Sequence, residues 1–173
     1  MEYVDVLDEF GEKTGVVKER SIAKKDKDYT LAAHVWILTS DKHILLQKRS
    51  FNCNNFPGMW DMTGGHVRAG ENSLEAVRRE LLEELGVSID ISELQFLFRL
   101  PAQKNSKPMF LDVYLLEKDV ELNQLVLQKE EVEEACFVPC SHLYDWNTEM
   151  GKLVPQPYLS DLFHILKEKT NEC

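Results

Sequence analysis

The segment from residue 72 to residue 85 constrains the fold most, because its apolar residues recur with the period of an α-helix. One stripe contains Leu74, Val77, Leu81 and Leu85. Asn72 can cap the N-terminus of this helix with Glu75 at the third helical position, and Gly86 suits the left-handed residue that ends a helix. The pattern predicts a helix over 72–85 whose stripe faces a core.

The segments around this helix have the composition of strands. Residues 3–19 are predicted to form a hairpin, and residues 31–50 a second hairpin that turns at Ser40 and Asp41. Further strands are predicted at 94–100, 109–117 and 135–139, loops at 50–60 and 101–108, and helices at 141–146 and 157–169. This mixture predicts an α/β fold with helices on the faces of a mixed sheet. At 173 residues, the chain is predicted to be a single domain, residues 1–173.

Composition argues against several classes of protein. The apolar runs are too short to cross a bilayer, and the acidic N-terminus lacks the pattern of a secretory signal. The cysteines lack zinc-site spacing and are expected to be free thiols in a reducing, cytoplasmic compartment; they are Cys53, Cys136, Cys140 and Cys173. A formal net charge of −10 disfavours nucleic acid as a partner. A small anionic ligand stays compatible if a metal ion bridges it to the protein.

Glu80, Glu83 and Glu84 stand at i, i+3 and i+4 of the predicted helix, so they are expected on one face, opposite the leucine stripe. At about 6 Å, each like-charge pair costs between ~0.7 kcal/mol in water and ~3 kcal/mol at an effective dielectric of about 20. One interpretation is a solvated acidic face offset by Arg78 and Arg79. The other is that the face binds a cation.

Gly64 and Gly65 precede the helix, and paired glycines permit backbone conformations that aim a carbonyl oxygen at a ligand. Carboxylates and a carbonyl are the hard oxygen ligands of Mg²⁺ or Mn²⁺, which would bridge to phosphate oxygens. These residue types therefore favour the cation interpretation.

The spacing G-x5-E-x7-R-E-U-x-E-E-x-G-U, where U is a bulky aliphatic residue, runs from residue 65 to residue 87. It is filled by Gly65, Glu71, Arg79, Glu80, Leu81, Glu83, Glu84, Gly86 and Val87. This pattern resembles the Nudix box. The resemblance implies an α/β/α sandwich around a mixed sheet, and attack of a metal-activated water on the diphosphate linkage of a small molecule.

The resemblance also implies roles by position. The ligands of Mg²⁺ or Mn²⁺ would be Glu80, Glu83 and Glu84, some of them through water, and the Gly64 carbonyl. Glu71 and Arg79 would be partners that hold the glutamates in place. All five side chains are thereby assigned to catalysis.

Other residues are assigned to the substrate or the proton transfer. Arg49, at the end of LLQKRS, matches a phosphate-contacting position, and Lys48 is expected to point the other way because strand neighbours alternate. The general base is a glutamate of the box or, from a later loop, Glu130 or Glu131, where a solvated charge run is the alternative. His66 is expected either beside the metal or in a structural hydrogen bond.

Several features have two interpretations. Asp112, an acid in an apolar strand, faces either a cleft or solvent. Aromatic residues serve either the core or stacking on a base; they are Phe51, Phe56, Trp60, Phe98, Phe110 and Tyr114. The group attached to the diphosphate is open among nucleoside di- and triphosphates and nucleoside-diphosphate derivatives. A homodimer is an ordinary outcome for such a chain.

The chain also resembles the branch of the family related to type 1 isopentenyl-diphosphate isomerase. The similarity lies in VDVLDEFGEKTG, LLQKRS, PGMWD and GGHV, within about the first half of the chain. The isomerases need a cysteine where Gly64 stands, and KKDKDYTLAAHVW has Lys and Thr in place of their metal-binding histidines. A hydrolase is therefore predicted, with two alternatives: isopentenyl-diphosphate isomerase activity, or a non-catalytic Nudix domain that binds nucleotides.

Overall fold

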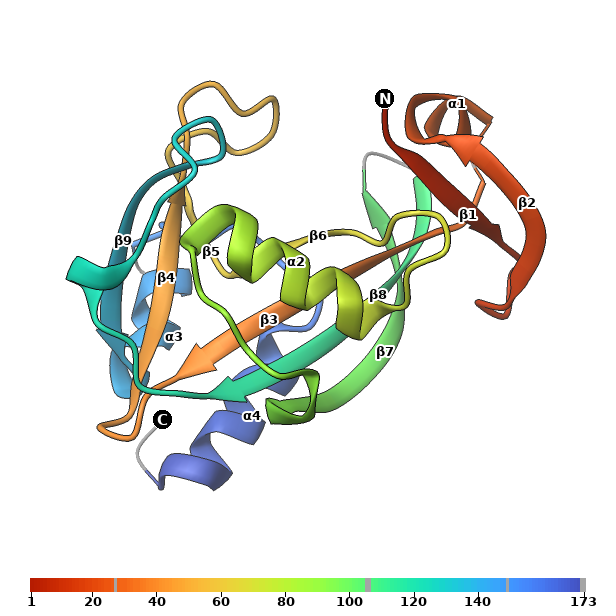
Figure 1. The fold of residues 1–173 in the computed structure, drawn as a ribbon. Helices are drawn as coiled ribbons and strands as arrows, with labels where there is room; N and C mark the ends of the chain where they lie inside the picture. Colours follow the sequence, from red (N-terminus) through yellow and green to blue (C-terminus); the bar gives the residue numbers. More distant parts are fainter. Residues whose placement is uncertain (27, 105–106, 149, 172–173) are drawn as a thin grey trace. The chain divides into compact units, whose positions relative to one another are not determined.

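The computed structural model describes residues 1–26, 28–104, 107–148 and 150–171 (Figure 1). The chain divides into two compact units, each described by itself. Unit 1 comprises Met1–Val35, Gly64–Leu82 and Ser88–Leu115, and unit 2 comprises Trp36–Thr63, Glu83–Val87 and Leu116–Cys173.

Helices are interspersed among runs of strands along the chain. Unit 1 contains β1 (Tyr3–Leu7), β2 (Lys13–Glu19), α1 (Arg20–Asp26), the 3-10 turn η1 (Ile91–Glu93) and β7 (Leu94–Lys104). Unit 2 contains β4 (His43–Arg49), β5 (Trp60–Asp61), the 3-10 turn η2 (Leu122–Gln124), β9 (Val132–Pro139), α3 (Cys140–Thr148) and α4 (Leu159–Thr170). Both units contribute residues to β3 (Thr30–Leu38), β6 (Thr63–His66), α2 (Ser73–Leu85) and β8 (Lys107–Glu117). Among the described helices, none has the length and apolar character to cross a bilayer.

The strands form two sheets. β1 and β2 pair antiparallel as an N-terminal hairpin. The larger sheet has the order β5-β4-β3-β8-β7, with β6 paired to β3 and β9 paired to β4. Within unit 2, β4 pairs antiparallel with β5, where Lys48 lies opposite Trp60, and with β9, where Lys48 lies opposite Glu134. The predicted α/β fold with a mixed sheet and an N-terminal hairpin is confirmed.

Within unit 1, the N-terminal hairpin is fastened to the loop that precedes α2. The Ala69 amide donates to the Tyr3 carbonyl (2.8 Å), and the Gly70 amide donates to the Asp5 carboxylate (3.1 Å). Asp5 also pairs with Lys13 of β2 (2.7 Å). Gly70 has a φ of 85°, which glycine adopts without strain. The hairpin therefore fixes the path of this loop.

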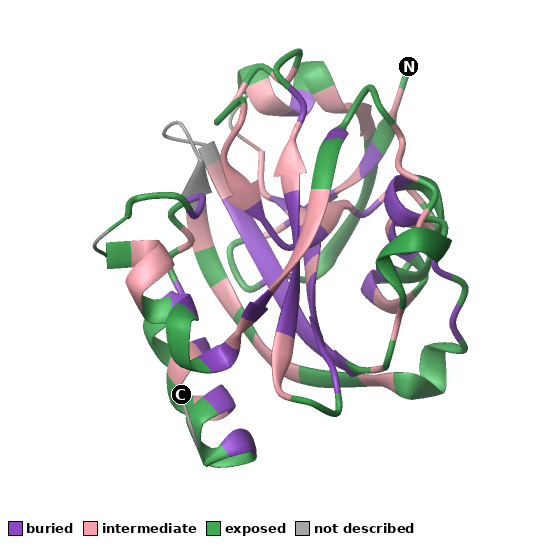
Figure 2. Cartoon of the chain, turned by 90° about the vertical axis from the view of Figure 1, so that its left-hand side faces the viewer, coloured by how far each residue is buried: buried purple, intermediate pink, exposed green. Residues whose placement is uncertain are grey.

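Buried positions concentrate on the strands of the larger sheet (Figure 2). In unit 2, α4 contributes Leu162 and Leu166, both fully buried. The buried Trp36 indole donates a hydrogen bond to the Tyr158 hydroxyl (3.3 Å), so both large side chains satisfy their polar atoms. Burying each apolar side chain of this size stabilises the fold by roughly 1.5–3 kcal/mol.

Helix α2 begins and ends as the sequence predicts. The Glu75 amide donates to Asn72 Oδ1, and the Asn72 amide donates to Glu75 Oε2, both at 2.9 Å. These two bonds make a complete capping box. Gly86 follows the helix with a φ of 72°, the left-handed conformation that terminates it.

The predicted placement of the glutamates opposite the leucine stripe is wrong for Glu84. Glu84 is only 7% exposed. It is buried, like Val77 of the apolar stripe, whereas Glu83 is exposed. Residue 84 follows Val77 by seven positions, almost two full turns, so both side chains leave the helix in nearly the same direction. The carboxylates therefore differ in environment and do not share one solvated face.

Element ends differ from expectation in several places. β7 continues to Lys104 and β8 begins at Lys107, so most of the predicted loop 101–108 is strand, and its residues 105–106 lie outside the described residues. β9 begins at Val132, inside the acidic stretch predicted as a turn. Helix α1 escapes prediction because Ala23 is its one buried residue, which leaves no apolar stripe to recognise.

Of the two positions predicted for Asp112, a cleft or a solvated face, the structure excludes the solvated face. It is 2% exposed and accepts hydrogen bonds from Arg99 Nε (2.6 Å) and Nη2 (2.9 Å) within unit 1. The hydrogen bond to Asp112 raises the pKa of Arg99. A buried carboxylate needs such a partner, and removing the arginine would leave an uncompensated charge.

Candidate active site

Arg79 is the centre of a compact ion cluster in unit 1. Its Nε and Nη2 donate to the two carboxylate oxygens of Glu71 (2.8 and 3.0 Å), and its Nη1 donates to Glu80 Oε1 (2.6 Å). Nη2 also donates to the His66 carbonyl (3.0 Å). We call Glu71, Arg79 and Glu80 the arginine cluster. Because the guanidinium is a rigid planar fork, it fixes the directions of both carboxylates.

Burial and pairing act in opposite directions on these charges. Burial lowers the pKa of Arg79, but the hydrogen bonds and charges of Glu71 and Glu80 outweigh it and raise that pKa overall. Burial raises the pKa of Glu71, but hydrogen bonds from Arg79 and the Arg68 amide lower it overall. Pairing therefore favours the charged forms of both Arg79 and Glu71.

Gly64 and Gly65 provide space, and neither has a positive φ. The prediction that the pair aims a carbonyl oxygen at a ligand stays a prediction, and the structure shows a second, steric reason for the glycines. A Cβ at Gly65 would overlap the Glu80 carboxylate. A Cβ at Gly64 would lie 2.5 Å from the Ala33 carbonyl oxygen and 2.9 Å from the His34 ring. The glycines allow a side chain of α2 and the backbone of β3 to approach β6 closely.

Gly65→Ala is expected to lower kcat/KM by roughly 10- to 100-fold, the usual effect of disturbing the surroundings of a metal site, because Glu80 is predicted to be a metal ligand. The added methyl group must push the Glu80 carboxylate away from the position in which Arg79 holds it. Steady-state kinetics on the substrate found by the assay below measures the effect. An unchanged kcat/KM in a folded variant would show that the position of Glu80 does not matter.

Glu84 belongs to a buried chain of hydrogen bonds in unit 2. Gln47 Nε2 donates to Glu84 Oε2 (2.7 Å), and the Thr63 hydroxyl donates to Gln47 Oε1 (3.0 Å). All three residues are buried. The Thr63 hydroxyl therefore determines which end of the Gln47 amide faces the carboxylate. Sequence reasoning does not single out Gln47; its position two residues before Arg49 on one strand is the available signal.

Arg49, assigned to the substrate, lies at the end of β4 in unit 2. Its guanidinium is 3.8 Å from the carboxylate of Asp61. Asp61 lies on β5, where it pairs with Gln47 of β4. Arg49 Nε donates to the Asn55 carbonyl (2.9 Å), so part of the guanidinium holds the loop after β4. The side chain is 24% exposed, which leaves it accessible to a ligand.

Lys48 belongs to a different group of side chains in unit 2. Its Nζ lies 5.7 Å from the Trp60 ring centroid and 5.8 Å from that of Phe51, and 3.5 Å from the Glu134 carboxylate. Trp60 packs edge-on against Trp146, with 5.6 Å between centroids. Lys48 thus has cation–π and ion-pair partners of its own.

The other aromatic candidates divide between core and surface. In unit 1, Phe110 and Tyr114 are buried, and Tyr114 shares a hydrogen bond of 2.7 Å with the Ser73 hydroxyl at the start of α2. Burial raises the pKa of Tyr114. Phe98 is half-buried, and Phe56 is exposed. The core interpretation therefore applies to Phe110 and Tyr114.

Glu130 and Glu131, the base candidates outside the box, are both exposed. In unit 2, the Gln128 amide donates to the Glu84 carbonyl (3.0 Å), which ties the turn carrying these glutamates to the end of α2. The Cys53 thiol lies 3.8 Å from the Glu131 carboxylate. Burial, with a contribution from Glu131, raises the pKa of Cys53, which disfavours the nucleophilic thiolate.

The donors expected from Glu80, Glu83, Glu84 and the Gly64 carbonyl are all hard oxygens, which are the ligands that Mg²⁺ and Mn²⁺ take in proteins. The chemistry of this donor set fits a divalent metal. Within the described residues, no three His, Cys, Asp or Glu side chains converge as they would around an ion, and Glu80 is held by Arg79.

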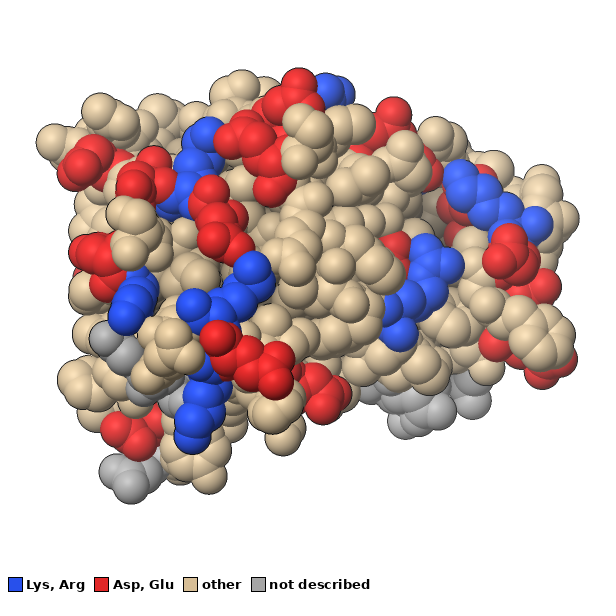
Figure 3. Space-filling view, turned by 90° about the horizontal axis from the view of Figure 1, so that it is seen from below, with Lys and Arg blue, Asp and Glu red and all other residues tan. Residues whose placement is uncertain are grey.

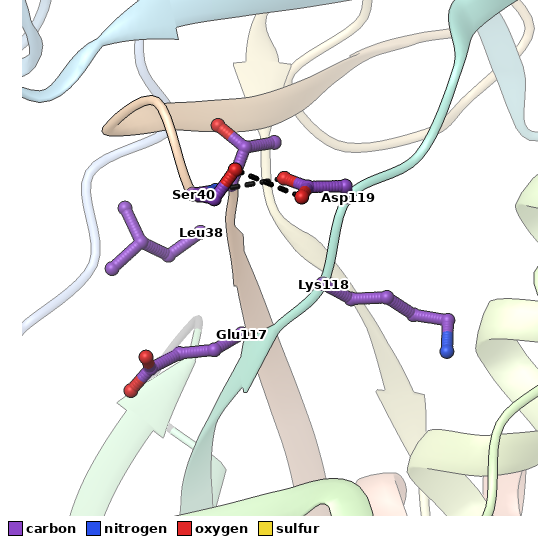
Figure 4. Close-up of a pocket in the computed structure, with 6 residues that line it drawn as sticks. Leu38, Ser40, Glu117, Lys118 and Asp119 are labelled. Atoms are coloured by element: carbon purple, nitrogen blue, oxygen red, sulfur yellow. Dashed lines mark hydrogen bonds between the residues drawn. The ribbon is translucent and has the colours of Figure 1, made fainter.

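A small cavity of unit 2, of about 140 Å³, is lined by Leu38, Thr39, Ser40, Glu117, Lys118 and Asp119 (Figure 4). The Asp119 carboxylate accepts hydrogen bonds from the Ser40 amide (2.7 Å) and hydroxyl (2.8 Å). Lys118 points away from this pair. These polar groups close the turn after β3, and the cavity contains none of the predicted site residues.

Comparison with known proteins gives a consistent result. A family model described as the NUDIX domain matches residues 28–157. Nudix hydrolase 3 of Arabidopsis thaliana is 39% identical over 175 residues, covering 88% of this chain, which spans only 23% of that protein's length. An uncharacterized Nudix hydrolase of Listeria monocytogenes is 34% identical over 171 residues, covering 98% of each chain. Nucleoside triphosphatase NudI of Salmonella agona is 31% identical over 120 residues, covering 64% of this chain and 84% of its own.

A solved structure has the same fold. The crystal structure of DR0079 from Deinococcus radiodurans superposes with a TM-score of 0.69 at 22% identity, covering 96% of this chain and 98% of that chain. At this identity the similarity concerns the fold alone.

Proposed function

The chain belongs to the Nudix family of pyrophosphohydrolases, and from that premise we propose that it cleaves the diphosphate linkage of a nucleoside di- or triphosphate or of a nucleoside-diphosphate derivative. The observation that carries the proposal is that Arg79 and Glu80 of the arginine cluster lie on the same helix as the buried Glu84, with Glu71 in the loop before it. The name of the Salmonella relative, a nucleoside triphosphatase, supports the nucleotide class.

In this proposal, Glu80, Glu83, Glu84 and the Gly64 carbonyl hold Mg²⁺ or Mn²⁺. A bound divalent cation supplies charge neutralisation for the diphosphate and lowers the pKa of a water molecule. Arg79 keeps the Glu80 carboxylate in a fixed direction, and Glu71 completes the pairing of the guanidinium. Gln47 keeps the Glu84 carboxylate in a fixed direction through the hydrogen bond from its Nε2. Because these supporting groups fix the directions of the carboxylates in advance, the carboxylates need not be reoriented when the metal binds.

Arg49 binds a phosphate of the substrate in this scheme. Its guanidinium has five N–H donors, of which Nε is engaged by the Asn55 carbonyl. A glutamate of the box, or Glu130 or Glu131, accepts the proton of the attacking water. The hydrogen bond between the Gln128 amide and the Glu84 carbonyl supports Glu130 and Glu131 as candidates, because it anchors their turn to α2.

Isomerase activity, the reaction of the branch that the first half of the chain resembles, is less well supported. It needs a cysteine at the position of Gly64, where even a Cβ would lie 2.5 Å from the Ala33 carbonyl oxygen. Nucleotide binding without turnover is also less well supported, because every glutamate and arginine of the box is present. Hydrolysis uses all of these residues.

Cys53→Ser is expected to leave kcat and KM within about twofold of the wild type, since a surface substitution without a catalytic role has little effect. Cys53 is half-buried, and its raised pKa disfavours the thiolate. Steady-state kinetics of the two proteins on the same substrate measures this. A large loss of activity would favour a cysteine-based mechanism.

The proposal also covers the location and the partners of the enzyme. The chain acts in the cytoplasm as one domain, residues 1–173, and as a monomer or homodimer. Its substrate is a small-molecule diphosphate, and it has no membrane or nucleic-acid partner. Free thiols at Cys53, Cys136 and Cys140 support the reducing compartment, whereas Cys173 lies outside the described residues. On the face shown in Figure 3, basic side chains lie beside acidic ones, which adds to the case against nucleic acid made by the net charge of −10.

Product analysis by mass spectrometry tests the proposed function. The protein is incubated with Mg²⁺ and, separately, with a chelator, against nucleoside di- and triphosphates, nucleotide sugars, dinucleotides and isopentenyl diphosphate. We expect metal-dependent cleavage of at least one nucleoside-diphosphate compound. Isomerised but uncleaved isopentenyl diphosphate would overturn the choice of hydrolysis over isomerisation.

A further inference from the structure

A hollow of about 460 Å³ in unit 1 lies where the start of the N-terminal hairpin meets the loop before α2. It is lined by Met1, Glu2, Tyr3, Arg68 and Ala69. The Ala69 amide donates to the Tyr3 carbonyl (2.8 Å), so the hairpin and the loop are joined at the hollow. The volume falls within the usual range of small-molecule sites, roughly 300–1,000 Å³.

Two guanidinium groups meet one carboxylate beside this hollow. Arg20 Nη1 lies 2.7 Å from Glu2 Oε2, and Arg68 Nε lies 3.5 Å from Glu2 Oε1. The two arginine side chains are 39% and 44% exposed, so a ligand can reach both. Guanidinium groups suit phosphate because their planar fork matches its oxygens. Tyr3, half exposed, adds an aromatic surface.

His66 connects the hollow to the arginine cluster. The Arg20 guanidinium lies 3.5 Å from Nδ1 of the His66 ring, and the His66 carbonyl accepts a hydrogen bond from Arg79 (3.0 Å). Arg79 in turn holds Glu80. These contacts all lie within unit 1, so one residue, His66, lies between Arg20 and the arginine that orients a proposed metal ligand.

We propose that this hollow is a recognition subsite for a phosphate-bearing part of the substrate beyond the scissile diphosphate, an inference that rests on the proposed hydrolase function. Arg20 and Arg68 bind the phosphate, and Tyr3 packs against the group that carries it. Glu2 keeps the two arginines together when the subsite is empty. Substrates with such an additional phosphate are therefore preferred to their counterparts that lack it.

Isothermal titration with 5′-AMP and adenosine, in a chelator and at low ionic strength, tests the subsite without turnover. The wild type should bind AMP at least about tenfold more tightly than adenosine, the effect of about one charge-assisted hydrogen bond. In the Arg20→Ala, Arg68→Ala double variant, the preference for AMP should fall by about tenfold, and any preference that remains is due to Arg49. The single Arg68→Ala variant, at a partly exposed position, should lose part of the preference and keep the wild-type Tm.

Lys25→Ala is the matched control, because Lys25 is an exposed cation on the same helix, α1, five residues after Arg20. It removes the same charge and should keep the preference for AMP. Equal binding of AMP and adenosine by the wild type, or undiminished AMP preference in the double variant, would overturn the subsite.

Glu84→Gln separates this inference from the proposed function. It should lose hydrolysis and keep metal-free AMP binding. If the wild type hydrolyses diphosphates but the double variant keeps the full preference for AMP, the subsite is wrong and the proposed function stands. If the wild type cleaves none of the diphosphates but prefers AMP through these arginines, the proposed function fails and the phosphate site stands.

Discussion

Glu84→Gln is expected to lower turnover by several orders of magnitude while leaving the fold intact. Glutamine keeps the shape of the side chain but removes the negative charge that a divalent cation requires. The buried position should tolerate the change, because Gln47 Nε2 can donate to the new amide oxygen as it now donates to Glu84 Oε2. Turnover number, Tm and far-UV circular dichroism measure both parts of the expectation.

Glu75→Gln is the matched control for this variant. Glu75 is an exposed glutamate of the same helix, and glutamine can still accept the capping hydrogen bond from the Asn72 amide. It should retain wild-type turnover. Full activity in Glu84→Gln would show that the assignment of Glu84 as a metal ligand is wrong.

Arg79→Lys is expected to lower kcat/KM by roughly 10- to 100-fold and to raise the Mg²⁺ concentration needed for half-maximal activity. Lysine preserves the charge but cannot reproduce the fork that reaches both Glu71 oxygens, Glu80 and the His66 carbonyl together. The Glu80 carboxylate would then lose its fixed direction. Kinetics at varied Mg²⁺ separates this effect from a change in substrate binding.

Arg78→Lys provides the comparison, since Arg78 is the exposed neighbour of Arg79 on α2. It should behave as the wild type does. If Arg79→Lys shows the same activity and the same Mg²⁺ dependence as Arg78→Lys, the arginine cluster has no part in orienting Glu80.

Local rules were sufficient to predict α2 and both hairpins. The capping box of Asn72 and Glu75, the stop at Gly86 and the turn residues between strands act over a few positions, so one sequence reveals them. The spacing of the box likewise identified the residues of the arginine cluster, because its members follow one another within a loop and a helix.

Features that depend on tertiary packing were missed or misassigned. Gln47 is 37 positions from Glu84, and its amide is meaningful only once β4 lies beside the helix end in unit 2. The sequence also did not reveal that the nearness of Glu80 and Ala33 excludes a side chain at the glycine pair. Asp112 required Arg99 from another strand. The periodicity of the sequence reports on residues a few positions apart and therefore does not reveal these long-range contacts.

Hydrolysis in H₂¹⁸O, with the products analysed by mass spectrometry, tests the central claim most directly. The account predicts that the wild type, with Mg²⁺, adds one ¹⁸O atom to a phosphate product of a nucleoside-diphosphate compound, and that Glu84→Gln forms no labelled product. Cleavage that leaves the phosphate products without ¹⁸O, or labelled product formed equally by Glu84→Gln, would contradict it.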